Sequence, residues 1–304
     1  MSQFLSTVLD YILSVSTLTT IGVTLLTLFC TSWIKNSFSK RFHVFKLKTD
    51  HNYAERKKVK ETISKNKVHL INACESLNHR FINFEENHSK GWHNVDRQYE
   101  TKSKYYFNSF VYRLALVYAW VNKIDGELVI MDTTVATKED IDFVKFLRVF
   151  KQVLSDISLF DKSKEYDSSK EIDHFFNGSV NTIANAMKNG DGDMITFDDY
   201  EKDLKLYSSK LIKVCEFLDG ASPDEDRQRW GRLQQLHLAL LCFLNQYGYD
   251  FQQTELKKIE TAFCWSMSDV LFSNFVVLLD RNMLSQNGEV KRIVKYFRKT
   301  QKGF

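Results

Sequence analysis

The chain has 304 residues, of which 43% are hydrophobic and 26% are charged, and its formal net charge at pH 7 is +4. One proline and 11 glycines are far fewer than turn-rich sandwiches and barrels use, which argues against an all-β fold. The 24 phenylalanines, 13 tyrosines and 5 tryptophans can build a packed core, which excludes a disordered or low-complexity chain. Composition therefore predicts an all-α protein.

The N-terminal part of the chain contains an uncharged run from Tyr11 to Ile34, bounded by Asp10 and Lys35. As a helix this run is roughly 36 Å long, enough to cross a hydrocarbon core of about 30 Å. A cleaved signal peptide would carry basic residues before the run, whereas here they follow it. We predict a retained transmembrane helix over residues 11–34, after a short extracytoplasmic segment 1–10. The alternatives are a cleaved signal and a buried or interfacial helix.

Hydroxyl side chains recur along one face of this predicted helix, at spacings of three or four residues. They are Ser16, Thr20, Thr24, Thr27 and Thr31. In lipid, small and hydroxyl side chains let helices approach closely and form hydrogen bonds with one another. The stripe therefore indicates a homo-oligomer packed through the transmembrane helix, or a hydroxyl-lined pore. The alternative is that each hydroxyl bonds a carbonyl of its own helix and needs no partner.

A basic linker follows over residues 35–60, with nine lysines or arginines against two acidic residues. By the positive-inside rule, the linker and everything after it lie in the cytoplasm. The sequence thus predicts a single-pass protein of the cytoplasmic (inner) membrane, with the N-terminus outside and the C-terminus inside. The five scattered cysteines contain no CxxC pair and suit buried, reduced thiols of a cytosolic domain. They are Cys30, Cys74, Cys215, Cys242 and Cys264.

Beyond the linker, apolar residues recur at a spacing typical of helices, which predicts a helical bundle over residues 61–288. The first helix covers about 53–86, and a polar loop follows at 89–104. Apolar side chains expected to point inward from this helix are Val59, Ile63, Val68, Ile71, Leu77, Phe81 and Phe84. The most apolar cytoplasmic stretch, 105–131, is predicted to be the central helix. Arg113 within it excludes a second membrane span.

Further helices are expected at about 139–159, 170–188, 197–219, 226–247, 254–284 and 289–299, with the clearest break at 220–226. The segment 189–200 is similar to an EF-hand calcium loop. Met194 and Tyr200, however, occupy the positions where that loop needs glycine and glutamate, and shifting the register places Met187 at the first ligand position. We interpret the segment as a glycine-rich connection into a helix that Thr196 or Asp198 caps.

No catalytic signature stands out, because GxSxG, HExxH, Walker A and GxGxxG motifs are missing from the sequence and its histidines are scattered. We therefore predict no catalytic residue, no metal ligand and no cofactor, and the sequence favours a protein that is not an enzyme. The lone histidines His174 and His237 are interpreted as structural residues.

Three arginines lie in apolar helical contexts, and they are Arg80, Arg113 and Arg148. They need carboxylate partners because an unpaired buried guanidinium is unfavourable. The candidate partners are Glu75, Glu127 and Asp142. We predict that these arginines form a buried ion-pair network or a site for an anionic ligand.

The C-terminal segment 289–304 is basic, whereas the bundle before it is net acidic. Its cations interleave with apolar residues and predict an amphipathic helix beside the inner leaflet, whose anionic lipids attract Lys and Arg. They are Lys291, Arg292, Lys295, Arg298 and Lys299. The alternative is a helix that contacts only solvent. Nucleic acid is not an expected partner, because the body is acidic and carries no recognised motif.

Several short motifs stand at the centre of these predicted helices. The first helix combines Leu77 with Arg80, and the next reads Tyr106-x-x-Ser109-x-x-Tyr112-Arg113 and ends in Trp120. Later blocks are His174-Phe175-Phe176, Phe197-x-x-Tyr200 and Arg232-Leu233-x-x-Leu236. In these blocks, from about residue 15 to 250, the chain resembles a group of uncharacterised bacterial and plant single-pass membrane proteins. The resemblance implies one membrane helix, a basic linker and a helical cytoplasmic domain, and it implies no particular activity.

These features predict a membrane-anchored helical interaction or regulatory protein without evident catalytic activity, in a role such as stress or phage defence. Its expected partners are the lipid bilayer, further copies of itself and an unidentified protein. One alternative is an effector that oligomerises through the hydroxyl stripe and perturbs the membrane. The other is an enzyme or small-ligand sensor built on Arg80 or Arg113.

Overall fold

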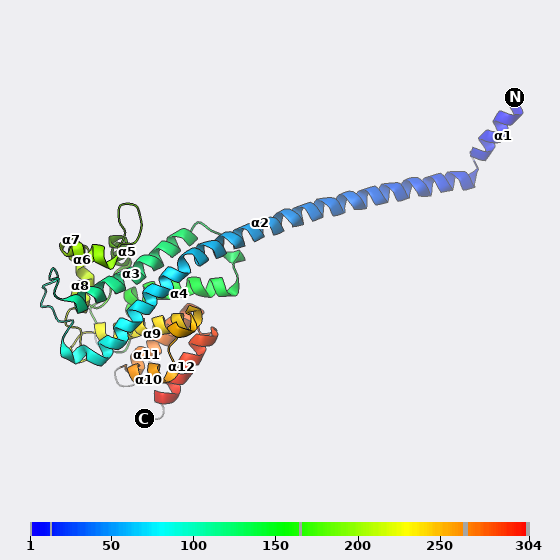
Figure 1. The fold of residues 1–304 in the computed structure, drawn as a ribbon. Coiled ribbons are helices and arrows are strands. Elements are labelled where there is room, and N and C mark those ends of the chain that lie inside the picture. Colours follow the sequence, from blue (N-terminus) through cyan, green and yellow to red (C-terminus); the bar gives the residue numbers. More distant parts are fainter. Residues whose placement is uncertain (1, 13, 164–165, 264–266, 302–304) are drawn as a thin grey trace. The chain divides into compact units, whose positions relative to one another are not determined.

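The computed structural model describes residues 2–12, 14–163, 166–263 and 267–301. Within these residues the protein is all-helical, as predicted, and its only β-type pairing is an isolated bridge between Lys188 and Met194 (Figure 1). The chain divides into two compact units, Met1–Lys57 and Lys58–Phe304. The chain begins with a short helix, α1 (Ser2–Ile12), and a very long one, α2 (Val15–Asn87). Helix α2 contributes to both units.

The predicted membrane segment 11–34 is not one uninterrupted helix, because α1 ends at Ile12 and α2 begins at Val15. Ser14, between them, accepts a backbone hydrogen bond from Thr17 N and shares a side-chain hydrogen bond of 2.5 Å with the Thr17 hydroxyl. Such local bonds compete with the helical ladder. From Val15 onward the run is helical, and the helix continues through the predicted linker 35–60.

The remaining helices all belong to the second unit. They are α3 (Tyr105–Leu128), α4 (Lys138–Ser155), α5 (Asn177–Ala186), α6 (Phe197–Lys202), α7 (Leu204–Lys210), α8 (Ile212–Leu218), α9 (Arg229–Tyr247), α10 (Leu256–Phe263), α11 (Asp269–Arg281) and α12 (Gly288–Gln301). Short 3-10 helices are η1 (His88–Lys90), η2 (Thr133–Val135), η3 (Ile157–Phe160) and η4 (Asp250–Gln252). Of the seven side chains predicted to point inward from the first long helix, six are buried, and Val68 is exposed.

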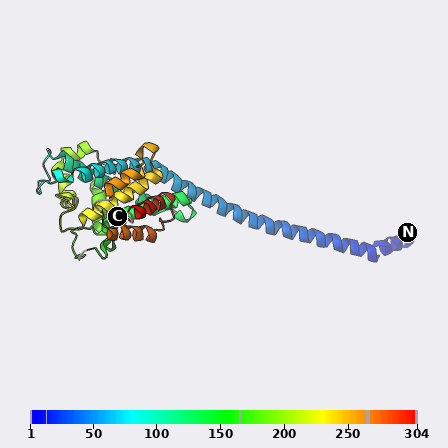
Figure 2. The same cartoon turned by 90° about the horizontal axis from the view of Figure 1, so that it is seen from below.

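Helix α9 is the most deeply buried element of this unit. Every residue from Arg229 to Asn245 is buried, including polar side chains such as Arg229, Arg232 and His237. It packs against α4, α11 and α12, and the yellow ribbon lies among them in both views (Figure 1, Figure 2). Gly231 allows α11 to approach closely, because a Cβ there would lie 2.4 Å from a Leu271 methyl carbon. Most of the predicted central helix, residues 105–131, forms α3. Helix α3 packs against α4, α5 and α8.

Two arginines at the start of α9 occupy the C-terminal ends of other helices. Arg232 donates from its two terminal nitrogens to the carbonyls of Val153 (2.5 Å) and Asp156 (3.1 Å), where α4 ends. Arg229 donates to three carbonyls where α8 ends, those of Glu216, Phe217 and Asp219. The last carbonyls of a helix lack partners within the helix and carry partial negative charge, so a guanidinium is well placed there.

The two guanidinium groups differ in how their charge is balanced. Arg229 forms a bidentate ion pair with Glu225, in which Nε donates to Oε1 and Nη2 donates to Oε2, each at 2.7 Å. Arg232 has no carboxylate within ion-pair distance among the described residues, and its guanidinium lies 4.1 Å from the centre of the Phe160 ring. Burial lowers the pKa of Arg232 to about 10, so the side chain is still charged at neutral pH. A buried cation is therefore neutralised by helix ends and an aromatic face.

Several predicted helices are shorter than expected, because polar side chains bond the backbone locally. The stretch 197–219 is divided into α6, α7 and α8, and the Asp203 carboxylate at the first break accepts a hydrogen bond from Leu206 N. In the stretch 170–188 only α5 is helical, and before it the Glu171 carboxylate accepts from Phe176 N. The stretch 254–284 gives α10 and α11, separated by a segment that includes the undescribed residues 264–266.

Three of the five cysteines are buried in the second unit as free thiols, as predicted for a reduced domain. They are Cys74, Cys215 and Cys242. Burial raises the pKa of each of these thiols above the ordinary value, to about 12 for Cys242, so they remain protonated. Cys30 is exposed, contrary to the expectation of burial, and Cys264 lies outside the described residues.

The arginine that caps α4 provides a test of this packing. Replacing Arg232 by methionine leaves the carbonyls of Val153 and Asp156 without a donor, so the free energy of unfolding should fall by about 3 kcal/mol. Arg281→Met is the matched control, because Arg281 also contacts Asp156 but is 48% exposed. The control should change stability by less than about 1 kcal/mol. Urea unfolding measures both, and equal effects would contradict the structural role of Arg232.

Candidate functional site

The three arginines singled out in the sequence do not form a common site. Arg80 is buried and donates from Nη2 to the Ser109 hydroxyl at 2.7 Å, and its guanidinium lies 4.2 Å from the centre of the Tyr106 ring. Arg113 donates to a backbone carbonyl of α2 at 3.4 Å. Burial and the nearby charge of Arg80 lower the pKa of Arg113. Arg148 is exposed on α4 and does not share this environment.

The carboxylates predicted to pair with these arginines bond other side chains. Glu75 accepts a hydrogen bond from Gln252 at 2.7 Å, and Glu127 accepts one from Asn66 at 2.9 Å. Asp142 forms an ion pair with Lys145 at 2.8 Å. Among the described residues, the predicted ion pairs are therefore replaced by other surroundings. Arg80 contacts a hydroxyl and an aromatic ring, Arg113 contacts a carbonyl, and Arg148 is exposed.

The calcium-like segment 189–200 folds as the alternative interpretation predicted. The Asn189 side chain accepts hydrogen bonds from the backbone nitrogens of Asp191 (3.0 Å) and Asp193 (2.9 Å), which closes the glycine-rich turn. Thr196 caps α6 and forms a reciprocal capping box with Asp199. In the part of the chain that the structure describes, no group of three or more His, Cys, Asp or Glu side chains could hold a metal ion.

The threonines of the N-terminal stripe bond their own helix. Each of Thr20, Thr24, Thr27 and Thr31 donates its hydroxyl proton to the carbonyl four residues earlier, at 2.7 or 2.8 Å. The fifth hydroxyl of the stripe, that of Ser16, lies 3.2 Å from the Ser14 hydroxyl. The threonine hydroxyl protons are thus used within one helix, which is the alternative named for this pattern.

The basic C-terminal helix α12 is part of the domain rather than a free amphipathic helix. Val290, Ile293 and Phe297 are buried in the core, and the Phe297 ring stacks on Phe272. Its five predicted cations are exposed, and Arg292 pairs with Glu289 at 2.7 Å. The other four line a cavity of about 570 Å³ with apolar walls, and they are Lys291, Lys295, Arg298 and Lys299. The end of the predicted basic segment, residues 302–304, lies outside the described residues.

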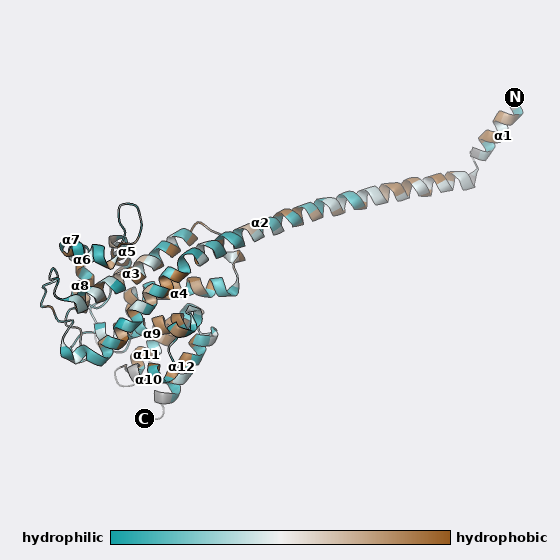
Figure 3. Cartoon of the chain, in the orientation of Figure 1, coloured by the Kyte–Doolittle hydropathy of each residue, from teal (hydrophilic) through white to brown (hydrophobic). Residues whose placement is uncertain are grey.

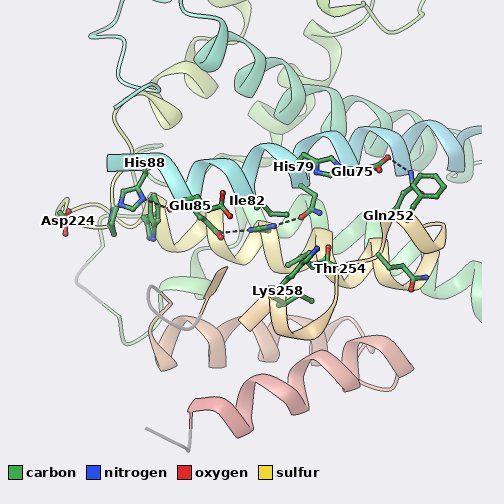
Figure 4. A pocket seen from close by; sticks show the side chains of 18 residues that line it. Glu75, His79, Ile82, Glu85, His88, Asp224, Gln252, Thr254 and Lys258 are labelled. Carbon is green, nitrogen blue, oxygen red and sulfur yellow. Dashed lines mark hydrogen bonds and ion pairs between the residues drawn. The ribbon is translucent and has the colours of Figure 1, made fainter. Parts of the chain in front are cut away.

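A larger cavity, of about 1040 Å³, lies where the C-terminal part of α2 faces α9 and the segment from η4 into α10 (Figure 4). The helix α2 contributes polar side chains at helical spacing, which places them on one face. They are Glu75, Asn78, His79, Glu85 and Glu86. Helix α9 contributes Trp230, His237 and Leu241. The far wall of the cavity, formed by the segment from η4 into α10, includes Phe251 and Lys258.

The floor of this cavity contains a hydrogen-bonded chain between α2 and α9. His237 is fully buried, and its Nδ1 lies 3.0 Å from Glu85 Oε1 while its Nε2 lies 2.8 Å from Asn78 Oδ1. The ring also stacks on Phe81, with 5.0 Å between centroids. Because both ring nitrogens are engaged, His237 positions Glu85 and is not free to act as a base toward the cavity.

Only one of the two carboxylate oxygens of Glu85 has a hydrogen-bond partner. Its side chain is 9% exposed, and its second carboxylate oxygen, Oε2, is buried without a hydrogen-bond partner. A buried acceptor without a donor is unfavourable by about 1–3 kcal/mol, more when it is charged. Native structures satisfy nearly all buried polar atoms, and in this lining the indole Nε1 of Trp230 is also buried without a hydrogen-bond partner.

The far wall of the cavity is fixed in place by side-chain amides. Asn245 of α9 donates to the carbonyl of Thr254 at 3.0 Å and accepts from its nitrogen at 2.8 Å. Gln252 of η4 donates to Glu75 of α2 at 2.7 Å. Gly248 permits the tight turn before η4, because a Cβ there would lie 2.6 Å from the Leu244 carbonyl oxygen. The cavity is therefore bounded on both sides by residues that the fold holds in position.

Neither Glu85 nor the acidic face of α2 is predicted from the sequence to form a site. From the sequence, Glu75 is expected only as a partner for an arginine, and His237 only as a lone structural histidine. The helical spacing of Glu75, Asn78, Glu85 and Glu86 was a signal, but only the structure shows which residues they face. Comparison of the chain with known protein-family models, curated proteins and solved structures finds no match.

Two buried histidines of the second unit, His93 and His174, are outside the cavity lining and favour their neutral form. His93 is buried, its Nε2 lies 2.8 Å from the Ala221 carbonyl, and its Nδ1 has no partner. Burial lowers the pKa of His93, and burial together with the charge of Arg232 lowers that of His174. Below the unfolded pKa of about 6.5, the unfolded chain therefore binds protons more readily than the folded chain does.

This linkage predicts that stability falls as the pH drops from 7 to 5. His93→Gln keeps a donor for the Ala221 carbonyl but cannot titrate, so the loss between pH 7 and 5 should become smaller. The control is His79→Gln, whose side chain is 69% exposed, and its pH dependence should match the unmodified protein. Urea unfolding at several pH values measures the slope. An unchanged slope for His93→Gln would contradict the assignment.

Proposed function

We propose that the protein is a single-pass inner-membrane protein whose helical cytoplasmic domain acts by binding a partner rather than by catalysis. The observation that supports the anchor is the exposure of apolar side chains along the first part of α2. Figure 3 colours the hydrophobic residues of this stretch brown. Leu26 is 67% exposed, Phe29 74% and Trp33 66%, whereas the second unit buries most of its large apolar residues. Such a surface favours a lipid environment.

Length and charge agree with this proposal. In the described part of the chain, one helix is long and apolar enough to cross a membrane, near the N-terminus. The cations that follow it support an orientation with the N-terminus outside and residues 35–304 in the cytoplasm. A regulatory role in stress or phage defence, through an unidentified protein partner, is part of the same proposal, and nucleic acid is not a proposed partner.

A second contact with the inner leaflet is proposed for α12. Lys291, Lys295, Arg298 and Lys299 are exposed around an apolar-walled cavity, which suits anionic lipid headgroups. Because the apolar face of α12 is buried in the domain, the contact would be electrostatic and would not involve insertion of the helix.

A homo-oligomer through the stripe that contains Thr20 and Thr27 remains part of the proposal. Since these hydroxyl protons are bonded within their own helix, association would rely on close packing of small side chains. An oligomer that perturbs the membrane is the corresponding alternative function.

A second candidate function is that of a small-ligand sensor, favoured by one observation. The cavity beneath α2 is large enough for a ligand, and Glu85 in its lining has a buried, unpartnered oxygen. The sensor was first expected around Arg80 or Arg113, and the cavity gives it a different location.

The anchor is tested by alkaline carbonate extraction of membranes from cells that express the full chain. We expect the protein to stay in the membrane pellet, and Leu26→Asp with Phe29→Asp to release it, because charges inside the bilayer are unfavourable. The matched control is Ile130→Asp, at an exposed apolar position of the second unit, which should not change the pellet fraction. Extraction of the unmodified protein, or a reporter showing residue 304 outside the cytoplasm, would contradict the anchor or its orientation.

The contact of α12 with lipid is tested with vesicles that contain increasing fractions of anionic lipid. The experiment uses a fragment of residues 58–304 whose cooperative unfolding is first verified. This fragment should bind the anionic vesicles in a salt-sensitive way, because surface charges are screened over about 8–10 Å. Reversing Lys295, Arg298 and Lys299 to glutamate should weaken binding at least tenfold. Reversal of Lys102, Lys104 and Lys188 changes the net charge equally and should have a smaller effect. Binding that ignores salt and both triple variants would contradict the contact.

A further inference from the structure

We propose that the cavity beneath α2 binds an organic amine, with an ammonium or amidinium group at Glu85 and an apolar body against Trp230. The inference rests on the sensor function proposed above and names the chemical class of its ligand. It combines three observations on the same cavity, namely its charge, its unpartnered acceptor and its aromatic surfaces (Figure 4).

The side chains around the cavity carry more negative than positive charge. Four carboxylates line it, and they are Glu75, Glu85, Glu86 and Asp224. Against them the lining has one lysine, Lys258, and three histidines, His79, His88 and His237. His79 lies 3.8 Å from the Glu75 carboxylate and His237 lies 3.0 Å from that of Glu85. A cluster of like charges beside low-dielectric walls attracts a ligand of opposite charge and repels an anion. The cavity therefore selects cations.

Glu85 provides the specific contact for such a cation. His237 holds Oε1, which fixes the carboxylate against the floor and leaves Oε2 without a donor. Because Oε2 is enclosed, a small displacement of the Glu85 side chain would bring it to a ligand N–H group, which would supply the missing hydrogen bond. With both partners charged, the bond would be of the stronger, charge-assisted kind. An amine or amidine thus satisfies an acceptor that the protein alone leaves unsatisfied.

Aromatic surfaces define the rest of the ligand. Trp230 packs between Phe84 and His88, with ring centroids 5.1 and 5.0 Å away, so it offers a rigid apolar face. At the other side, Phe251 lines the cavity although it is 78% exposed. Aromatic faces attract cations and bury apolar groups. The volume of about 1040 Å³ accommodates an amine attached to an aromatic or aliphatic body.

Titration calorimetry on the full chain in detergent tests the inference with defined probes. Phenethylamine and benzamidine are the cations, and benzamide and benzoate are matched neutral and anionic compounds. We expect the two cations to bind and the matched compounds to bind at least tenfold more weakly. Benzoate binding as tight as benzamidine binding, or no binding of either cation at about 10 mM, would overturn the inference.

Variants assign the binding to named side chains. Glu85→Gln removes the charge and should weaken cation binding about tenfold, whereas Glu100→Gln, an exposed residue outside the lining, should leave it unchanged. Lys258→Gln removes a like charge and should strengthen cation binding, and Phe251→Ala should weaken it. A folded Glu85→Gln protein with unchanged affinity would overturn the inference.

Lys258 and Phe251 are both exposed, so their variants test the site even if Glu85→Gln does not fold. Unchanged affinity in both would then overturn the inference. The sensor function has a separate test. If the protein binds amines but its interactions with other proteins do not change, the amine site is supported and the sensing role is contradicted.

Discussion

The fold of the second unit depends on cations buried at helix ends. Arg232 is fully enclosed and donates to the final carbonyls of α4, while Arg229, one turn earlier, serves α8 in the same way. Helix α9 therefore fixes where two other helices end, in addition to burying its own apolar surface. For Arg232, carbonyl dipoles replace the usual carboxylate partner of a buried arginine, and they act only when the helices lie in the correct position, whereas Arg229 also pairs with Glu225. The arrangement thereby links the placement of α4, α8 and α9.

The same helix connects this framework to the candidate site. Trp230 lies between the two arginines in sequence and faces the cavity, and His237 lies two turns further along on the floor. Both cavity walls are attached to α9, the near wall through Glu85 and the far wall through Asn245. A ligand that moved Glu85 would act on the most deeply buried helix of the domain, so occupancy of the cavity and the packing of the core are physically coupled.

The sequence predicted those features of the fold that a local pattern of residues determines. The all-α class, the break at 220–226 and the cap at Thr196 followed from composition, glycine and proline placement, and capping chemistry. Partners distant in sequence were not predictable, because an arginine in an apolar helix needs only acceptors, and helix carbonyls satisfy it as well as a carboxylate does. Arg80 found a hydroxyl and an aromatic ring, and Glu85 found a histidine 152 positions away. Spacing along a helix identifies a face but not what covers it.

The cysteines divide the described chain by chemical reactivity. Cys74, Cys215 and Cys242 are enclosed and protonated, so these three thiols are shielded from electrophiles and oxidants in water. Cys30 is open, and it lies in the apolar stretch of α2. Among the described cysteines it is thus a natural single attachment point for a thiol-directed label. A maleimide reacts with the thiolate in water, so labelling of Cys30 would depend on whether lipid or water surrounds this stretch of α2.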